Sequence, residues 1–362
     1  MTETNVAGAD PVVSVIVRSA GRPALSAALA SIAAQDYPSI EVVVVAMSGL
    51  APPTVPDRCG PHPVRLVQAA ADLGPPEAAN AGLDAATGDW ITFLDEADVF
   101  LPAHLSGLMA VREGAPESAV IHSHALAVLA DGREFPFGQP YCLAQLYDHN
   151  FIHLSAAVFR RSLVEQGCRF DAQLPVHHEW DLFLQMAQRA SFRFVPRKTF
   201  RWNVGAGGHG VGDGITPQDP TEDECRQILH AKWAVHRDAL IDRVEPVLRS
   251  AAELKQHGNF PAAEARCREV LAISPNDPWA LNLLASIERD TGRASDARRT
   301  QELAVAVRPQ HPALIFNLAL LYRAQGNLER ARRCCDRALE LDADFVPAQR
   351  MREELARIPV VR

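Results

Sequence analysis

The chain has 362 residues, 48% of them hydrophobic, and a formal net charge of −8. This length suggests two domains with ordinary cores, and the negative charge argues against a nucleic-acid partner. No apolar run approaches the roughly 18 residues of a membrane span, and the first residues lack the parts of a signal peptide. Seven cysteines without regular spacing favour a reducing compartment. We therefore expect a cytoplasmic protein without a transmembrane segment.

The N-terminal part alternates apolar runs with helical patterns. Strands are predicted at 12–17, 41–45, 64–67, 90–94, 119–121, 154–159, 192–195 and 199–204. Helices are predicted at 23–35, 76–86, 102–112, 162–166 and 177–187, with a hairpin turn at Asp131-Gly132. Strands that alternate with helices predict a mostly parallel sheet, with ligands bound at the carboxyl ends of its strands.

The apolar run 90–94 is followed at once by three acids, Asp95, Glu96 and Asp98. Negative charge at the edge of a buried sheet needs a cation or hydrogen-bond donors. Divalent ions with oxygen ligands are the usual solution, and they often also hold substrate phosphates. The alternative is a solvated turn whose acids cap the next helix.

The order of short motifs resembles that of family-two glycosyltransferases with the GT-A fold. The matching stretches are Val13-Ser-Val-Ile-Val17, Gln35-Asp-Tyr-Pro38, Glu41-Val-Val-Val-Val45, Ala79-Asn-Ala-Gly82, Thr87-Gly-Asp-Trp-Ile-Thr-Phe-Leu-Asp95, Ala157-Val-Phe-Arg-Arg161 and His178-Glu-Trp-Asp-Leu182. The resemblance implies an α/β domain that transfers a sugar from a nucleotide-sugar donor to an acceptor hydroxyl with inversion. It also implies Mn or Mg held by a D-x-D motif, and a carboxylate base at the start of the late helix.

Carried over by position, Asp95 matches the first acid of D-x-D, which would contact donor and metal. Ala97 stands where the family has its metal-binding Asp, so Asp98 or Glu96 would have to serve the metal. His209 resembles a histidine that some GT-A enzymes add to the metal site. Its alternative is a solvated residue in a glycine-rich loop. The metal ligands implied are therefore Asp95, Asp98 and His209.

Glu179 matches the catalytic base, and Asp181 matches a second acid for which a structural role is expected. The positive end of a helix dipole lowers the basicity of Glu179, so burial near Trp180 or the neighbouring Asp181 would have to keep it competent. The alternative is that Glu179 only complements the helix dipole.

Further donor contacts are expected from Arg18, Arg22 and Asn80. The two arginines could pair with donor phosphates, or could be a surface pair. At Arg18 the common family pattern has Pro. At Ala46-Met-Ser-Gly49 the family often has D-D-G-S, whose first Asp recognises the nucleotide base.

After a glycine-rich loop at 205–214 and a helix predicted at 221–241, the chain becomes periodic. Gly258, Gly292 and Gly326 are 34 residues apart, which is the tetratricopeptide period. Alanines keep the same spacing, at 251, 285 and 319 and at 263, 297 and 331. The pattern predicts three repeats and a capping helix at 347–357. Such stacks bind peptides or proteins in a concave groove, or serve as rigid extensions or dimer contacts.

The sequence thus predicts a GT-A domain at 1–215, a connecting helix at 216–243 and an all-α tetratricopeptide domain at 244–362. The function expected is an inverting glycosyltransferase, with a nucleotide sugar as donor and repeats that recruit a protein or peptide partner or the acceptor. The alternative is a degenerate GT-A domain that binds without catalysis and serves as a scaffold, which Ala46 and Ala97 favour.

Overall fold

The computed structural model of the protein describes residues 10–47, 53–68, 73–205 and 220–358. The chain divides into two compact units. The first consists of Met1–Gly138 and His149–Lys232, and the second of Gln139–Asp148 and Trp233–Arg362. A short segment from the middle of the N-terminal half therefore belongs with the C-terminal unit. The domain boundaries expected from the sequence stay a prediction.

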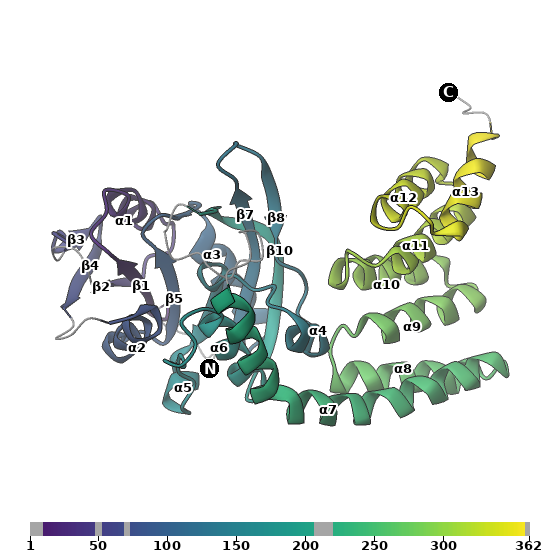
Figure 1. Cartoon of the computed structure of the whole chain (residues 1–362), viewed down its shortest axis with the longest axis horizontal. Helices are drawn as coiled ribbons and strands as arrows, with labels where there is room; N and C mark the ends of the chain where they lie inside the picture. The colour runs from purple at the N-terminus through teal and green to yellow at the C-terminus, as the bar shows by residue number, and fades with distance from the viewer. Residues whose placement is uncertain (1–9, 48–52, 69–72, 206–219, 359–362) are drawn as a thin grey trace, which may run out of the picture. The chain divides into compact units, whose positions relative to one another are not determined.

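Within the described residues, the first unit is built on a ten-stranded mixed sheet of order β3-β4-β2-β1-β5-β9-β7-β10-β6, with β8 paired to β7 (Figure 1). The strands are β1 (Val13–Ser19), β2 (Ile40–Ala46), β3 (Arg58–Cys59), β4 (His62–Gln68), β5 (Trp90–Asp95), β6 (Val99–Phe100), β7 (Ser118–Val128), β8 (Glu134–Phe137), β9 (Ala157–Arg160) and β10 (Ser191–Asn203). The strands β4, β2, β1 and β5 are parallel neighbours, so their carboxyl ends meet at one edge. This is the α/β architecture expected from the sequence.

Helices cover both faces of the parallel strands because side chains alternate along a strand. Val13, Val15 and Val17 share a core cluster with residues of α1 (Leu25–Ala33). Ile16 points to the other face, where α2 (Pro75–Ala85) packs at Gly82. A Cβ atom at Gly82 would overlap the Ile16 side chain, so this close approach requires glycine.

The remaining helices of the first unit lie close to their predicted ranges. They are α3 (His104–Met109), α5 (Arg161–Glu165) and α6 (His178–Ala187), with 3₁₀ turns at Ala110–Gly114 and Leu154–Ala156. The hairpin predicted at Asp131-Gly132 is confirmed by the antiparallel pairing of β7 with β8.

Four strand predictions were wrong in extent. The strand predicted at 119–121 is the eleven-residue β7, which continues to Val128 through polar residues. The two late strands are one strand, β10, because its pairing with β7 continues across register shifts between Val195 and Phe200. The strand predicted from Leu154 begins only at Ala157, after a 3₁₀ turn.

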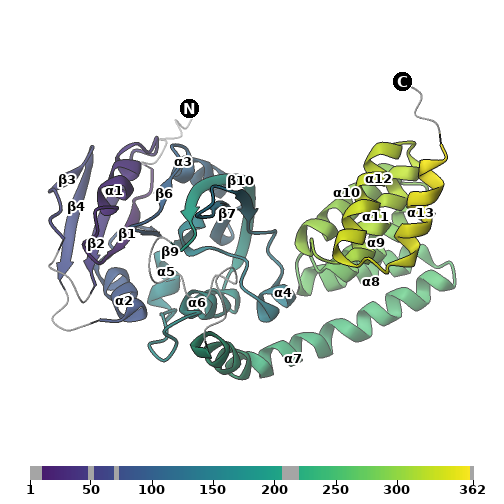
Figure 2. The same cartoon turned by 45° about the horizontal axis from the view of Figure 1, so that its top comes forward.

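The second unit is a stack of helical hairpins, seen as successive antiparallel helices in Figures 1 and 2. Its helices are α4 (Leu143–Asp148), the C-terminal part of α7 (Pro220–Gln256), α8 (Phe260–Ile273), α9 (Pro278–Asp290), α10 (Ala294–Val307), α11 (Pro312–Ala324), α12 (Leu328–Leu341) and α13 (Val346–Ala356). Helix α7 is unbroken, so the helix end predicted at Ile241 was wrong. The predicted capping helix is confirmed as α13.

The three periodic glycines end the first helix of each hairpin. Gly258, Gly292 and Gly326 all have φ between 75° and 81°, a left-handed conformation that favours glycine. The periodic alanines are fully or almost fully buried where paired helices cross. None of the helices in the described residues combines the length and the apolar character that a membrane crossing requires.

The segment Gln139–Asp148 is fixed to the repeats through polar contacts. The side-chain amide of Asn276 donates a 2.8 Å hydrogen bond to the carbonyl oxygen of Tyr141. The thiol of Cys142 lies 3.9 Å from the hydroxyl of Ser274, and Cys142 is fully buried. Both contacts are made to the turn between α8 and α9, so the segment depends on the first repeat.

Candidate active site

Arg18 and Asp95 form the centre of the candidate site. Strands β1 and β5 are parallel neighbours, and these two residues face each other in the register at the carboxyl edge. The Arg18 guanidinium donates from Nε to Oδ1 at 2.9 Å and from Nη2 to Oδ2 at 3.0 Å. Arg18 is 8% exposed and the Asp95 side chain 38%, so the interpretation of Arg18 as a surface residue was wrong. Both oxygens of Asp95 have an arginine donor.

Glu96 faces the loop that follows β1. Its carboxylate accepts a 2.6 Å hydrogen bond from the Ser19 hydroxyl and a 3.3 Å bond from the backbone N–H of Arg22. The Arg22 guanidinium lies 3.6 Å away and is more exposed than that of Arg18. Because Glu96 is buried, these contacts give it a positioning role in the loop between β1 and α1.

Asp98 fixes the turn between β5 and β6 to the end of β10. Its Oδ1 accepts a 2.8 Å hydrogen bond from the backbone N–H of Asn203, whose side-chain amide donates to the carbonyl oxygen of Ala97 at 2.6 Å. The backbone N–H of Asp98 also donates to the carbonyl oxygen of Asp95 at 3.0 Å. Burial and the nearby charge of Asp95 raise the pKa of Asp98 well above its ordinary value.

Glu179 lies in the first turn of α6 and reaches the same centre. Its Oε1 lies 3.0 Å from Nε2 of His178 and 3.5 Å from Nη2 of Arg18. The Arg18 guanidinium is also 3.2 Å from His178 Nε2. Arg18 thus connects the acid at the end of β5 with the acid at the start of α6. His178 is a site residue that the sequence does not predict by itself, although it directly precedes Glu179.

The surroundings of Glu179 favour its ionised form. Burial alone would raise its pKa, but His178 and then Arg18 outweigh burial and hold the pKa well below its ordinary value. The expectation that burial or Asp181 would keep Glu179 basic was therefore wrong. The Glu179 side chain keeps 25% of its surface exposed, so its carboxylate is accessible from solvent.

Asp181 points away from this centre. It is fully buried, accepts a 2.7 Å hydrogen bond from Gln185 and pairs with Lys232 at 2.9 Å. Lys232 also pairs with Asp171 at 2.7 Å. These contacts attach the start of α7 to α6 and support the structural role expected for Asp181.

Asn80 lies on α2 and holds the chain that leads to α6. Its amide donates to the carbonyl oxygen of Phe170 at 2.8 Å and accepts from the Phe170 backbone N–H at 3.0 Å. The Phe170 ring in turn packs at 5.6 Å from the ring of His178. Contact of Asn80 with a donor stays a prediction.

The predicted metal ligands are only partly described. His209 lies outside the described residues, as do residues 48–52 after β2. Across residues 10–47, 53–68, 73–205 and 220–358, no three His, Cys, Asp or Glu side chains come together in a way that could hold a metal ion. Ala97 offers no side-chain oxygen, and both oxygens of Asp95 are bound by Arg18. The described residues do not fit the metal that the resemblance implied.

Two family models match this chain. Residues 13–165 match Glycosyl transferase family 2, and residues 312–345 match the Tetratricopeptide repeat. The N-terminal unit carries a family-two glycosyltransferase domain. The glycosyltransferase match covers β1 through α5, and with it Arg18 and Asp95. The repeat match covers α11 and α12, one of the hairpins of the second unit.

Curated relatives of the glycosyltransferase domain come from two bacteria. The chain is 26% identical to the uncharacterized glycosyltransferase YwdF of Bacillus subtilis, over 51% of this chain and 71% of YwdF. It is 30% identical to the succinoglycan biosynthesis protein ExoO of Rhizobium meliloti, over 43% of this chain and 49% of ExoO. The chain therefore spans about half the length of ExoO. Among solved structures, S. aureus TarS is 15% identical with a TM-score of 0.48, over 95% of this chain and 55% of TarS.

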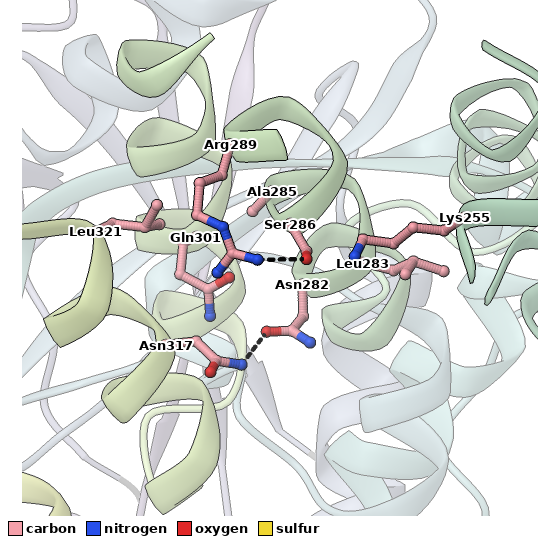
Figure 3. A pocket seen from close by; sticks show the side chains of 9 residues that line it. All are labelled: Lys255, Asn282, Leu283, Ala285, Ser286, Arg289, Gln301, Asn317 and Leu321. Atoms are coloured by element: carbon pink, nitrogen blue, oxygen red, sulfur yellow. Dashed lines mark hydrogen bonds between the residues drawn. The ribbon is translucent and has the colours of Figure 1, made fainter. Parts of the chain in front are cut away.

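A pocket in the second unit is lined by residues of α7, α9, α10 and α11 (Figure 3). Asn317 on α11 donates a 2.8 Å hydrogen bond to the side-chain oxygen of Asn282 on α9. The basic residues beside them are Lys255 and Arg289, which both pair with Asp290, at 2.8 Å and 2.9 Å. The sequence predicted a groove but not these residues, because the 34-residue period identifies packing positions rather than groove-lining ones.

Proposed function

We propose that this chain transfers a sugar from a nucleotide-sugar donor to an acceptor hydroxyl, with inversion at the anomeric carbon. The glycosyltransferase family match supports a transferase. The observation that carries the proposal is the position of Glu179. Its partly exposed carboxylate lies beside Arg18 and Asp95, at the sheet edge where α/β proteins bind their ligands.

In this proposal Glu179 takes the proton of the attacking hydroxyl as the new glycosidic bond forms. Inversion requires that the hydroxyl attack from the face opposite the departing nucleoside diphosphate, so the base and the diphosphate lie on opposite sides of the sugar. A carboxylate with a lowered pKa is a weak base but is fully ionised at neutral pH. It therefore assists most when proton transfer is late, after the bond to the diphosphate has largely broken.

The cations of the site lie on the donor side in this proposal. Arg22 is the more exposed of the two arginines, with 32% of its side chain accessible, so it is the better candidate for a direct phosphate contact. Arg18 would act from behind Asp95, because its guanidinium is buried against protein carboxylates. Donor binding by both arginines is part of this proposal.

A donor screen with the full chain tests the proposal. The protein is incubated with a panel of sugar nucleotides, and release of the nucleoside diphosphate and binding of the donor are measured separately. We expect one donor to be bound and hydrolysed, and hydrolysis to fall strongly in Glu179→Gln while binding is kept. Binding of a donor without any turnover, in wild type and variant alike, would favour the scaffold alternative.

The scaffold alternative has its own support. Ala97 removes one acid of D-x-D, and the acids that remain after β5 are engaged by protein groups. An ionised, accessible carboxylate at the start of α6 has no evident use in a scaffold, and this favours the enzyme. The predicted Mn or Mg site at Asp95, Asp98 and His209 stays a prediction that the described residues do not support.

We further propose that the pocket of Figure 3 binds an extended peptide segment that carries an acidic group. The amides of Asn282 and Asn317 match the donors and acceptors of a peptide backbone. Lys255 and Arg289 share Asp290 as their partner, which leaves one positive charge in excess next to these amides. Screening an array of acidic, neutral and basic peptides tests this. Acidic peptides should bind the wild type, and Asn282→Ala with Asn317→Ala should lose the binding while donor hydrolysis is unchanged. Equal binding of basic peptides would contradict the assignment.

A further inference from the structure

Each of the three acids after β5 is engaged by groups of the protein itself. Asp95 is held by two donors of Arg18, and Glu96 by the Ser19 hydroxyl and the backbone of Arg22. Asp98 is held by the backbone of Asn203. A carboxylate at a buried sheet edge needs a cation or hydrogen-bond donors. Here β1, the loop after it and the end of β10 supply them.

We propose that Arg18 is a built-in cation that takes the place of a divalent ion at Asp95, so that this site binds its donor without a divalent metal. The proposal rests on the proposed function only for the identity of the donor. The guanidinium is planar and matches both carboxylate oxygens, and it remains charged at any physiological pH. It therefore compensates the negative charge of Asp95 permanently, whereas a bound ion would do so reversibly.

The contacts around Arg18 explain why a metal ion would compete poorly. An ion that bound Asp95 would have to displace two charge-assisted hydrogen bonds of a residue that is 8% exposed. The Arg18 side chain is 8% exposed and that of Arg22 32%, so water would compensate a displaced Arg18 guanidinium less than that of Arg22. Ala97 cannot offer a second carboxylate, and its carbonyl oxygen already accepts from Asn203. The protein would thus lose more internal contacts than the ion would provide.

Arg18 also links the two sides of the site. It lies 3.5 Å from Glu179 while it holds Asp95. One cation therefore positions the donor-side acid and the base relative to each other. Arg18 is thus a positioning residue, and its loss should disturb both partners, because Asp95 loses its cation and Glu179 keeps His178 beside it.

Binding of Mn²⁺ alone to the full chain, measured by titration calorimetry, tests the proposal. We expect at most weak binding at Asp95 in the wild type. Arg18→Ala frees Asp95 and Glu179 and should bind Mn²⁺ about ten- to a hundredfold more tightly, the equivalent of the lost charged hydrogen bonds. The double variant Arg18→Ala with Asp95→Asn should lose this binding again. Arg22→Ala is the matched control, because it removes a neighbouring arginine and leaves the pair of Arg18 and Asp95 intact.

Tight Mn²⁺ binding by the wild type that Asp95→Asn abolishes would overturn the proposal. So would an Arg18→Ala variant that folds and gains no Mn²⁺ affinity. If Arg18→Ala does not fold, Mn²⁺ titration of the wild type and of Asp95→Asn still tests the proposal. The titration uses neither donor nor acceptor, so a negative donor screen leaves it unaffected. Conversely, a transferase that is active only with Mn²⁺ held at Asp95 would overturn this inference and leave the proposed function standing.

Discussion

The neighbours of Glu179 set the acid limit of the proposed activity. Since His178 and Arg18 hold its pKa below the ordinary value of 4.5, the ionised base persists as the pH falls and is lost only below that value. We expect kcat/KM to show no loss from Glu179 between pH 7 and pH 4.5 as long as the protein stays folded. His178→Ala should move the acid limit upwards. A wild-type limit above 4.5 that His178→Ala does not change would contradict the assignment.

Glu179→Gln tests the base more directly. It keeps the size of the side chain and removes the proton acceptor, so turnover should fall by about 10²–10⁴-fold while donor affinity changes little. Asp181→Asn is the matched control on the same helix turn, and it should lower stability rather than turnover. Wild-type transfer rates in a folded Glu179→Gln protein would show that another group takes the proton.

Two buried histidines should make stability depend on pH. Burial lowers the pKa of His104 and of His122 to about 3, and both side chains are fully buried. Below pH 6.5, the ordinary pKa, these two histidines bind protons in the unfolded chain but remain neutral in the folded chain until the pH approaches about 3. The free energy of unfolding should therefore fall by about 1.4 kcal/mol per pH unit for each histidine.

Urea denaturation at pH 7 and pH 5 measures this loss. His122→Phe should remove the contribution of His122, because the ring lies among the aromatic side chains of Phe151, Phe192 and Phe194 and its two nitrogens have no hydrogen-bond partner among the described residues. An identical pH dependence in wild type and His122→Phe would mean that other groups cause the loss.

At the scale of elements, the ion pair of Lys232 with Asp181 attaches α7 to the helix that carries Glu179. Lys232→Met would leave a fully buried carboxylate without its cation and should cost about 2 kcal/mol of unfolding free energy, since Lys232 itself is partly exposed. Chemical denaturation measures the loss. The double variant with Asp181→Asn should recover part of it, and an additive second loss would show that the two side chains do not interact.

The sequence predicts the elements of this fold better than their contacts. The β-branched runs of β1 and β2 and the apolar run of β5 predict buried strands. By contrast, the polar residues His122, Ser123 and His124 concealed the continuation of β7, because the periodicity of an apolar run cannot indicate a buried histidine.

In the candidate site, too, the sequence predicts the residues better than the contacts between them. Asp95 is predicted by its place at the end of a strand, and Glu179 by its match to the base of the family that the motifs resemble. Their connection through Arg18 depends on the register between β1 and β5 and on where α6 begins. Nothing local in the sequence encodes a contact between residues so far apart in the chain, and motif matching reports only the motif.

At the scale of the whole molecule, we expect removal of the repeats to destabilise the N-terminal fragment that remains. A truncation after Asp242 removes Ser274 and Asn276, the partners of the segment Gln139–Asp148. Its buried side chains, among them Tyr141, Cys142 and Leu146, would then lack their surroundings. We expect the truncated protein to melt at a lower temperature and to bind a hydrophobic dye. A truncation as stable as the full chain would show that this segment folds without the repeats.

The same segment sets an order of events during synthesis. Residues 139–148 leave the ribosome well before the turn that receives them, since about 130 residues lie between Asp148 and Asn276. At a usual rate of about 5–20 residues per second, that delay is on the order of ten seconds. During this time the apolar segment 139–148 is part of the nascent chain, whereas its partners Ser274 and Asn276 have not yet been synthesised. Slower translation of the first repeat would lengthen this exposure, and a chaperone that binds short apolar segments would find its target here.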